Sequence, residues 1–411
     1  MTTADYLSRH QSALVAFLQR LVRIRTVNPP GENYGEITKV LTETLRDLGL
    51  QVRRVPIPRA VQKKTQPDQL DYPRYNVIAF WDAGAKKTIH FNAHYDVVPV
   101  SGKWRHNDPF NPAVEKGWVY GRGSADMKGA ITSIIFDLRA LRATGARPLC
   151  NVEVSFTADE ETDSVLGANW VVDHGKVRAD YAVVGEGGEG DGVCCGHNGV
   201  VWLTVKVHGK AAHGSTPQKG INALEKMSAL VLALDGYKKI LARRKFRTPE
   251  GKLMTPTLNL GGVFSAGEGG KVNTVPAFAS FTIDRRVLPV ENLKAAEKEL
   301  RTYLKKAAAK IPACRIEVEK ISDNYSCYSA PTSPFFKAMQ QSVTRTRRRP
   351  AHAMVSTGFN DMHFFAQHLK IPTIGYGPSG EDYHAVDERA RVNDLVDSAQ
   401  IYADLLTTFA G

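Results

Sequence analysis

The residues of this sequence best suited to chemistry are two histidines and five carboxylates, most of which stand just after short apolar runs. They are His94, Asp96, Asp126, Glu160, Glu161, Glu186 and His384. Imidazole and carboxylate groups without a thiolate suit zinc, manganese or cobalt better than a structural thiolate site does. The sequence therefore indicates a catalytic metal site.

Each of these residues also has a simpler interpretation when it is taken alone. Asp126 precedes a helical segment and could cap that helix, and Glu160-Glu161 could be surface charge. Adjacent glutamates become informative if they divide roles, one binding a metal and the other acting on a water beside it. His94 followed by Asp96 is more specific, because an aspartate can orient a ligating imidazole from behind.

Strand and helix patterns alternate over the first half of the chain, which favours a mostly parallel sheet covered by helices. The predicted strands are 52–55, 75–80, 88–93, 152–158 and 181–185, and the predicted helices are 14–22, 37–48 and 129–144. Ligands bind at the carboxyl ends of the strands of such sheets, where most of the candidate residues stand. The polar segment 59–73 is predicted to be a surface insertion.

The pattern changes near Gly199, where apolar residues begin to alternate with others as in a half-buried strand. Further strands are predicted at 257–262, 277–285 and 315–321, and helices at 221–234 and 291–310. We therefore expect an inserted α+β domain over 199–317, with two helices on one face of a four-stranded antiparallel sheet. Residues 1–198 and 318–411 would form the α/β catalytic domain, with a strand at 371–376 and a closing helix at 393–409.

Composition places the chain among globular proteins. Of 411 residues, 43% are hydrophobic and 23% charged, which is ordinary for such proteins. The five cysteines form no Cys-x-x-Cys pair, which favours reduced thiols and a cytoplasmic location. The N-terminus lacks an apolar signal core, and no apolar run approaches the ~20 residues of a membrane span.

Net charge is +12, with basic clusters at 63–64, 243–247 and 345–349. Such clusters raise the possibility of nucleic-acid binding. However, the sequence has no basic stripe interleaved with aromatic residues and no recognised nucleic-acid motif. We interpret the charge as solvated surface with some attraction for anionic substrates, and we expect no nucleic-acid partner.

Longer motifs around the candidate residues resemble the co-catalytic zinc amidohydrolases, a family that includes aminoacylase, acetylornithine deacetylase, succinyl-diaminopimelate desuccinylase and glutamate carboxypeptidase. The resemblance extends over nearly the whole chain. The motifs are Asn28-Pro29-Pro30-Gly31, His94-Tyr95-Asp96-Val97-Val98-Pro99, Gly121-Arg122-Gly123 through Asp126-Met127-Lys128-Gly129, Asp159-Glu160-Glu161, Ala212-His213-Gly214-Ser215, and His384-Ala385 with Asp387-Glu388.

This resemblance implies two divalent metal ions, most often zinc, with cobalt or manganese as alternatives. One metal would be bound by His94 and Glu186 and the other by Glu161 and His384, with Asp126 bridging them. Glu160 would be the general base, and Asp96 would orient His94. The resemblance also predicts a cis peptide bond after Asp126.

The resemblance extends to the inserted domain. His213 would donate a hydrogen bond to the oxyanion across the interface of a homodimer formed through this domain. Asn273 and Arg285 match positions that bind substrate, and Arg285 would hold a substrate carboxylate because its guanidinium is a planar fork. Arg285 and its neighbour Arg286 could equally be ordinary strand-edge charges.

Two departures from the family pattern bear on the substrate. Glu186 is followed by Gly187-Gly188 where many members have proline, and Phe359 replaces a smaller residue of several members. Phe359 would favour an apolar substrate group and disfavours desuccinylase-type recognition.

We expect a hydrolase that removes the acyl group from N-acyl amino acids or similar small amides carrying a carboxylate. The alternatives are a carboxypeptidase or dipeptidase with the same metal chemistry, and a binding protein that has lost catalysis. The complete set of metal ligands with Glu160 argues against the binding protein.

Overall fold

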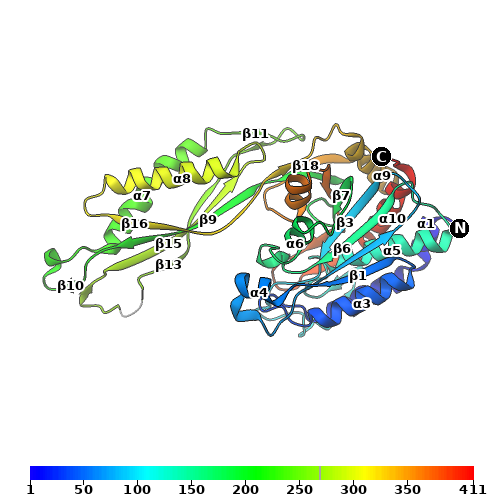
Figure 1. The fold of residues 1–411 in the computed structure, drawn as a ribbon, viewed down its shortest axis with the longest axis horizontal. Helices are drawn as coiled ribbons and strands as arrows, with labels where there is room; N and C mark the ends of the chain where they lie inside the picture. Colours follow the sequence, from blue (N-terminus) through cyan, green and yellow to red (C-terminus); the bar gives the residue numbers. More distant parts are fainter. Residues whose placement is uncertain (268–269) are drawn as a thin grey trace. The chain divides into compact units, whose positions relative to one another are not determined.

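The computed structural model describes residues 1–267 and 270–411. The chain divides into two compact units (Figure 1). Unit 1 contains Met1–Gly196, Ser329–Ser356 and Asn360–Gly411, and unit 2 contains His197–Tyr328 and Thr357–Phe359. The predicted inserted domain is thus present, but its predicted end at 317 falls inside a strand, because that strand continues to Asn324 and pairs within unit 2.

The main sheet of unit 1 is parallel in its centre and antiparallel toward its edges. In spatial order its strands are β1 (Gln51–Pro56), β2 (Tyr75–Trp81), β6 (Asn151–Thr157), β3 (Thr88–His94), β7 (Tyr181–Val184), β19 (Thr373–Gly375) and β8 (Gly192–His197), with β18 (His352–Ser356) beside β8. Pairs β6–β3, β3–β7 and β7–β19 are parallel, whereas β1–β2, β2–β6 and β19–β8 are antiparallel. The sheet is therefore mixed, with the predicted parallel strands at its centre.

Helices pack against this sheet and against each other. They are α1 (Thr3–Arg9), α2 (Gln11–Arg23), α3 (Tyr34–Asp47), α4 (Arg59–Thr65), α5 (Lys128–Thr144), α6 (Ala168–Asp173), α9 (Pro334–Arg347) and α10 (Val392–Thr408). Helix α3 lies on β1 and β2, and α5 lies between β3 and α10. Every residue of β3 is buried, which explains why this strand reads as a continuous run rather than as an alternation.

A small four-stranded sheet carries the loop that contains His384. Its order is β20 (Gly380–Glu381), β21 (Arg389–Arg391), β5 (Trp118–Tyr120) and β4 (Ala113–Glu115). The loop 382–388 connects β20 with β21, and β21 leads directly into α10. This arrangement holds both ends of an otherwise exposed loop.

Unit 2 is built on a four-stranded antiparallel sheet in the order β13 (Leu258–Ser265), β15 (Phe278–Val287), β9 (Gly199–His208) and β16 (Arg315–Asn324). Helices α7 (Ala223–Leu241) and α8 (Leu293–Ala309) lie along one side of this sheet (Figure 1). Alternate residues of β9 are buried beneath them in one apolar cluster. The predicted α+β architecture of the inserted domain is confirmed. Two short antiparallel strand pairs, β10–β14 (Ala212–His213 with Thr274–Val275) and β11–β12 (Phe246–Arg247 with Leu253–Met254), complete unit 2.

The segment 59–73, predicted to be a surface insertion, is mostly exposed and contains regular structure. It forms α4 and a 3-10 turn, η1 (Pro67–Gln69). Gln62 is buried and donates hydrogen bonds to the carbonyl oxygens of Gln69 and Tyr72. Polar side chains can bind backbone groups in this way without a periodic apolar pattern, so the sequence carries little sign of the order.

Asp137 is a buried carboxyl group in the middle of α5, and neither of its oxygens has a hydrogen-bond partner among the described residues. Burial raises the pKa of Asp137 well above its usual range. Because the pKa is higher in the folded state, ionisation costs folding free energy. The cost begins as pH rises above the unfolded pKa of ~3.9 and grows until pH passes the folded pKa.

Replacing Asp137 by asparagine should therefore stabilise the protein at neutral pH by at least about 1 kcal/mol, because the variant has no buried carboxyl group to ionise. Denaturant unfolding of both proteins from pH 3 to pH 8 would measure this difference. The two curves should converge at the acid end, where Asp137 is protonated in both states. A stability gain that does not change with pH would contradict the explanation.

Candidate metal centre

Three neighbouring parallel strands bring the candidate ligands to one edge of the main sheet. His94 ends β3, Glu160 and Glu161 begin a 3-10 turn after β6, and Glu186 follows β7. Because β6, β3 and β7 are adjacent and parallel, their carboxyl ends meet, as ligand sites of α/β sheets require. Asp126 stands just before α5, and His384 comes from the loop 382–388.

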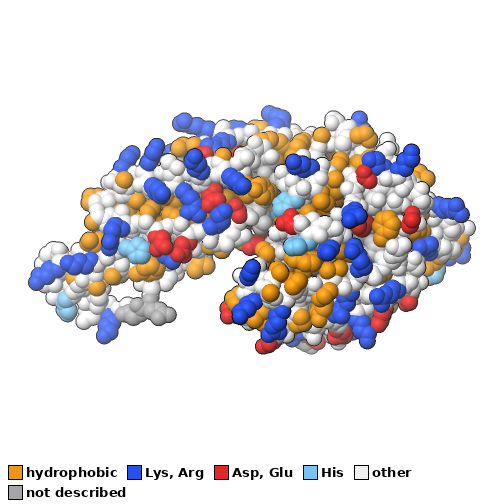
Figure 2. All heavy atoms as spheres, viewed as in Figure 1, with side chains coloured by type: hydrophobic (Ala, Val, Ile, Leu, Met, Phe, Trp, Pro, Cys, Tyr) orange, Lys and Arg blue, Asp and Glu red, His pale blue; other side chains and the backbone are white. Residues whose placement is uncertain are grey.

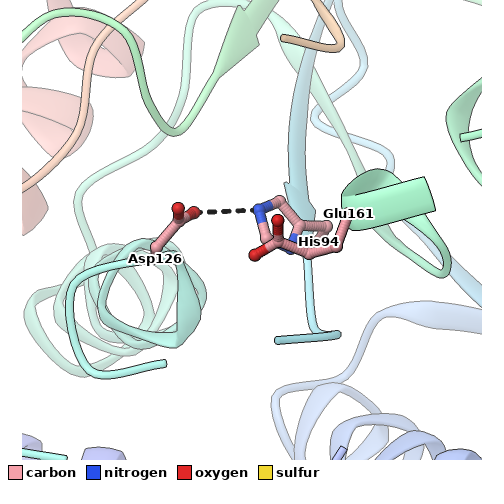
Figure 3. A group of neighbouring side chains, drawn as sticks. All are labelled: His94, Asp126 and Glu161. Atoms are coloured by element: carbon pink, nitrogen blue, oxygen red, sulfur yellow. Dashed lines mark hydrogen bonds and ion pairs between the residues drawn. The ribbon is translucent and has the colours of Figure 1, made fainter. Parts of the chain in front are cut away.

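Asp126 lies between two imidazoles. Its Oδ1 is 3.1 Å from Nε2 of His94, and its Oδ2 is 3.1 Å from Nε2 of His384. Nε2 of His384 is also 3.1 Å from Oε2 of Glu161. Figure 3 shows Asp126 and His94 directed toward each other with Glu161 beside them. One ligand atom from each of these three residues lies within 4.8 Å of the others, a spacing that one cation could occupy.

Burial and mutual repulsion shift the ionisation of the glutamates. Burial raises the pKa of Glu160 and Glu186 well above the usual range, and neighbouring carboxylates add to both shifts. Burial and the charge of Asp126 raise the pKa of Glu161 to about 7. If all three glutamates were ionised, the surrounding protein groups would not compensate their negative charge. Divalent cations at the site would do so.

The pKa values of the two imidazoles are raised, whereas burial alone lowers the pKa of a histidine. Hydrogen bonds with Asp126 and Glu161 raise the pKa of His384 to about 10. For His94, burial acts against the charged form, but hydrogen bonds with Asp126 and Asp96 raise its pKa well above the usual value. In Asp126, burial is outweighed by the bonds from His384 and His94, which lower its pKa.

The donor set fits divalent metal ions. Oε1 of Glu161 and Oε1 of Glu186 are buried, and neither has a hydrogen-bond partner among the described residues. Buried carboxylate oxygens are normally paired, so two unpaired ones beside two imidazoles are explained by a ligand role. The site offers nitrogen and oxygen donors only, which zinc, cobalt and manganese all accept.

Asp96 contacts His94 and both adjacent glutamates. Its backbone oxygen is 3.1 Å from Nδ1 of His94. Its carboxylate accepts the backbone N–H groups of Glu160 and Glu161, each at 3.2 Å, and the side-chain amide of Asn28 at 3.0 Å. One buried aspartate therefore contacts three of the candidate residues, one through its backbone and two through its carboxylate.

Asp159 anchors the turn that carries the two glutamates, a role that the sequence did not indicate. Its backbone is left-handed, with φ of 62°. Its buried carboxylate accepts hydrogen bonds from Arg74 at 3.0 Å, Tyr34 at 3.0 Å, Asn28 at 3.1 Å and Gln66 at 2.9 Å. Gln66 belongs to the segment 59–73, so that segment supports the site.

Glu388 fixes the segment that contains Asp126. One oxygen of this buried carboxylate accepts the backbone N–H groups of Gly123, Ala125 and Asp126, each at 3.0 Å. Its other oxygen is paired with Arg122, which also donates to the carbonyl oxygen of His384 at 3.1 Å. Asp126 and His384 are thus positioned by the same pair. The Asp126–Met127 peptide bond is cis, as the resemblance predicted.

Asp361 is a further buried carboxyl group that the sequence reasoning missed. It accepts a short hydrogen bond from Ser164. Burial raises its pKa to about 6, and its charge acts on Glu160 and Glu186. It lies in a loop without a periodic pattern, so only its neighbour Phe359 had drawn attention to this part of the chain.

Two of the residues predicted in the inserted domain lie together within unit 2. His213, in β10, is exposed, and its Nδ1 is 2.7 Å from Oγ of Ser215. Asn273 immediately precedes β14, the partner strand of β10, and its carbonyl oxygen accepts the N–H of Gly214. Their predicted roles toward a substrate stay predictions.

Arg285 is placed differently from what its predicted role requires. Its side chain is fully buried, and its Nη2 is 2.7 Å from Oε1 of Glu291. Because residues alternate along β15, Arg285 faces the helices, while Arg286 faces the opposite side, with 27% of its side chain exposed. Arg286 pairs with Asp284 at 3.0 Å and lies over the ring of Phe359. The predicted role of Arg285 toward a substrate carboxylate stays a prediction, and Arg286 is the more accessible of the two guanidinium groups.

Comparison with known proteins identifies a class of metal-dependent hydrolases. Residues 90–408 match the profile of peptidase family M20/M25/M40. The chain is 27% identical to an acetylornithine deacetylase of Proteus mirabilis, covering 91% of this chain and 89% of that protein. It is 29% identical to a succinyl-diaminopimelate desuccinylase of Methylocella silvestris, covering 81% and 85%.

Solved structures share the fold. An M20 family metallo-carboxypeptidase of Sulfolobus solfataricus superposes with a TM-score of 0.78 at 20% identity, covering 96% of this chain and 98% of that one. A dinuclear metal binding peptidase of Bacillus subtilis gives 0.70 at 18% identity, covering 97% and 98%. The chain belongs to peptidase family M20/M25/M40. It is a metal-dependent enzyme that hydrolyses amide bonds.

Among the described residues, no helix is long and apolar enough to cross a bilayer. Lysine and arginine side chains are spread over the visible face, with acidic side chains among them (Figure 2).

Proposed function

We propose that this chain is a dinuclear metal-dependent deacylase that removes the acyl group from an N-acyl amino acid. The observation that carries the proposal is Asp126, whose two carboxylate oxygens each face a different imidazole. A carboxylate in this position can bridge two metal ions. The names of relatives, acetylornithine deacetylase and succinyl-diaminopimelate desuccinylase, support an acyl amino acid as substrate.

His94 and Glu186 would hold one metal ion, and Glu161 and His384 the other, with Asp126 shared. The 3.1 Å approach of His384 to Glu161 supports the second pair. Burial of Glu186 with one unpaired oxygen supports its place in the first. Zinc is our first choice, with cobalt or manganese as alternatives.

Bound metal ions would polarise the substrate carbonyl and lower the pKa of a water at the site. Glu160 supplies the proton transfer. Its side chain is largely buried, with 14% exposed, and its Oε2 is 3.9 Å from Nε2 of His94. We assign Glu160 to take the proton of the attacking water and return it to the leaving amine. His213 would stabilise the oxyanion, and Asn273 would contact the substrate.

Arg286 would bind the carboxylate of the substrate, and an apolar group would lie against nearby aromatic rings. Phe359 and Trp202 form an edge-to-face pair with centroids 5.9 Å apart, and the guanidinium of Arg286 lies 5.8 Å from the ring of Phe359. A guanidinium over one ring of an aromatic pair suits a carboxylate that carries an apolar substituent.

Replacing Arg286 by glutamine should raise KM for a carboxylate substrate about 10- to 100-fold, because a charged hydrogen bond contributes about 1.5–3 kcal/mol. The matched Arg285→Gln variant should keep its KM but lose about 3 kcal/mol of stability, because it breaks a buried ion pair. Steady-state kinetics and denaturant unfolding of both variants measure these effects. An unchanged KM for Arg286→Gln would remove it from this role.

A homodimer through unit 2 would bring His213 of one subunit to the substrate of its partner. Strand β13 is an edge of its sheet, and it exposes 67% of Val263 and 75% of Phe264. Leu232 on α7, which packs over the neighbouring β15, is 70% exposed. An apolar edge of this kind favours pairing with another chain.

Replacing Phe264 by glutamate should therefore shift the protein to monomers and remove nearly all activity if His213 acts across the interface. Sedimentation velocity measures the first effect, and an assay on the same sample measures the second. Val114→Glu in unit 1, where 51% of Val114 is exposed, is the matched control. A fully active monomer would refute the contribution in trans.

Chelator-stripped enzyme should recover amide hydrolysis when zinc, cobalt or manganese is added back. The substrates would be N-acetyl, N-succinyl and N-formyl amino acids beside dipeptides. Release of free amino acids from acyl compounds would support the deacylase. Cleavage of dipeptides alone would establish the alternative, a dipeptidase or carboxypeptidase, and absence of any activity would refute both.

A further inference from the structure

A charged cavity of about 600 Å³ lies in unit 1, and none of the proposed metal ligands lines it. Its walls come from the segment after Glu186, the end of α9, the start of β20 and the start of α10. The charged residues and the glycine that matter here are Glu189, Asp191, Arg347, Arg349, Gly380 and Arg391. Both signs of charge therefore border one cavity.

Arg347 is only partly satisfied by its protein neighbours. Its Nη1 lies 2.6 Å from Asp394 and 3.2 Å from Asp397, and its Nε donates to Tyr376. Its Nη2 is buried, and among the described residues it has no hydrogen-bond acceptor. A buried charged donor without an acceptor is costly, so this wall can accept an anionic group.

Two further arginines strengthen the attraction for an anion on this side. Arg349 and Arg391 are exposed and line the same cavity. Arg391 also precedes the first turn of α10, and its side chain does not cap that helix. The N-terminus of a helix favours negative charge, which adds to the effect of the guanidinium groups.

Acidic residues line the same cavity. They are Glu189, Asp191, Glu381, Asp394 and Asp397, and Glu189 accepts a hydrogen bond from Tyr383 at 3.2 Å. A simple anion would be repelled by these carboxylates, and a simple cation by the arginines. The chemistry that matches both kinds of charge is a small molecule that carries a carboxylate and an ammonium group.

We propose that this cavity binds a free α-amino acid, with its carboxylate at Arg347 and Arg391 and its ammonium group at Glu189 and Asp191. The inference rests on the proposed function only in that a free amino acid is a product of deacylation. The cavity would thus be a second site for the product, distinct from the metal centre.

Tyr383 connects this cavity with the metal centre. Its hydroxyl oxygen accepts the N–H of Gly380 at 2.9 Å and donates to Glu189, and both partners line the cavity. Tyr383 directly precedes His384. An ammonium group at Glu189 competes with this hydrogen bond, so occupancy of the cavity loosens the loop that holds His384. Bound amino acid would therefore lower kcat.

Calorimetric titration of the zinc-loaded, full-length enzyme tests the site, with L-serine as the probe. Asp191→Asn and Arg391→Gln should each weaken binding about 10-fold or more, the loss expected for one charged hydrogen bond. Asp68→Asn and Arg20→Gln, which change exposed residues outside the cavity, should bind serine as wild type does. Ethanolamine and 3-hydroxypropionate, which lack the carboxylate and the ammonium group respectively, should bind at least about 10-fold more weakly.

The second measurement is the change in kcat that serine causes, with each protein in the absence of serine as its own reference. Serine should lower kcat of the wild type, and the decrease should be smaller in Asp191→Asn at the same concentration. Absence of serine binding, equal binding by all four variants, or binding of either analogue as tight as that of serine would overturn the proposal. Calorimetry needs no turnover, so an enzyme without deacylase activity would refute the proposed function and leave this site testable.

Discussion

Glu160→Gln should lower kcat by about 10²- to 10⁴-fold, the usual contribution of a positioned general base, and leave the metal content unchanged. Glutamine keeps the size of the side chain and cannot take a proton. The carboxylates that approach His384 are Glu161 and Asp126, each at 3.1 Å, and we do not assign Glu160 as a ligand. Its loss should therefore affect proton transfer rather than metal binding.

The adjacent residue gives a matched control for this result. Glu161→Gln should lose metal, and excess zinc should restore part of its activity because the general base is intact. Glu160→Gln should not respond to added zinc. Metal analysis after dialysis, with kcat measured over a zinc titration, separates the two. Zinc loss from Glu160→Gln would make Glu160 a ligand and exchange the two roles.

The positions of His94, Glu160 and Glu186 in the fold could be predicted because each ends or follows a buried strand. An apolar run that ends in polar residues marks both the strand and its carboxyl end, so the order of residues alone places His94, Glu160 and Glu186 at one edge of the sheet. Their mutual distances could not be predicted, because they depend on the register of the β3–β6 and β3–β7 pairs.

The sequence was least informative where packing, rather than local pattern, decides which residues are buried or form an element. Arg285 and Arg286 are indistinguishable in sequence, and only the helices over one face of β15 bury the first and expose the second. Strand β8 was missed because its glycines and cysteines lack an alternating pattern, although all its residues are buried. Helix α9 was also missed, although Ser333 and Pro334 carry the signals of a helix start.

The supporting residues were missed for a related reason. Asp159 and Glu388 stand inside recognised motifs, yet their roles depend on backbone N–H groups and side chains far away in sequence. Buried carboxylates that accept several such bonds are recognisable only once the fold is known. Asp159 and Glu388 position the segments that carry Glu160 and Asp126. The distances within the metal centre therefore depend on residues that are not themselves candidate ligands.

Asp126→Asn should remove at least one of the proposed metal ions and lower kcat/KM by about 10³-fold or more, because metal ions contribute several kcal/mol to the transition state. The asparagine side chain has one oxygen and no charge, so it cannot replace two carboxylate oxygens that face His94 and His384, each at 3.1 Å. Metal analysis of the purified variant measures the loss.

Asp361→Asn is the control for this substitution. Asp361 is also a buried carboxyl group of the same acidic cluster, but its Oδ1 is taken by Ser164. This variant should keep its metal content, because it removes charge from the cluster without removing a bridging ligand. If Asp126→Asn binds as much metal as the wild type, Asp126 is not a metal ligand. If instead Asp361→Asn loses as much metal as Asp126→Asn does, the loss reflects the total negative charge of the cluster rather than a bridge. The dinuclear assignment would then have to be replaced by a single ion held by His94, Asp126 and Glu161.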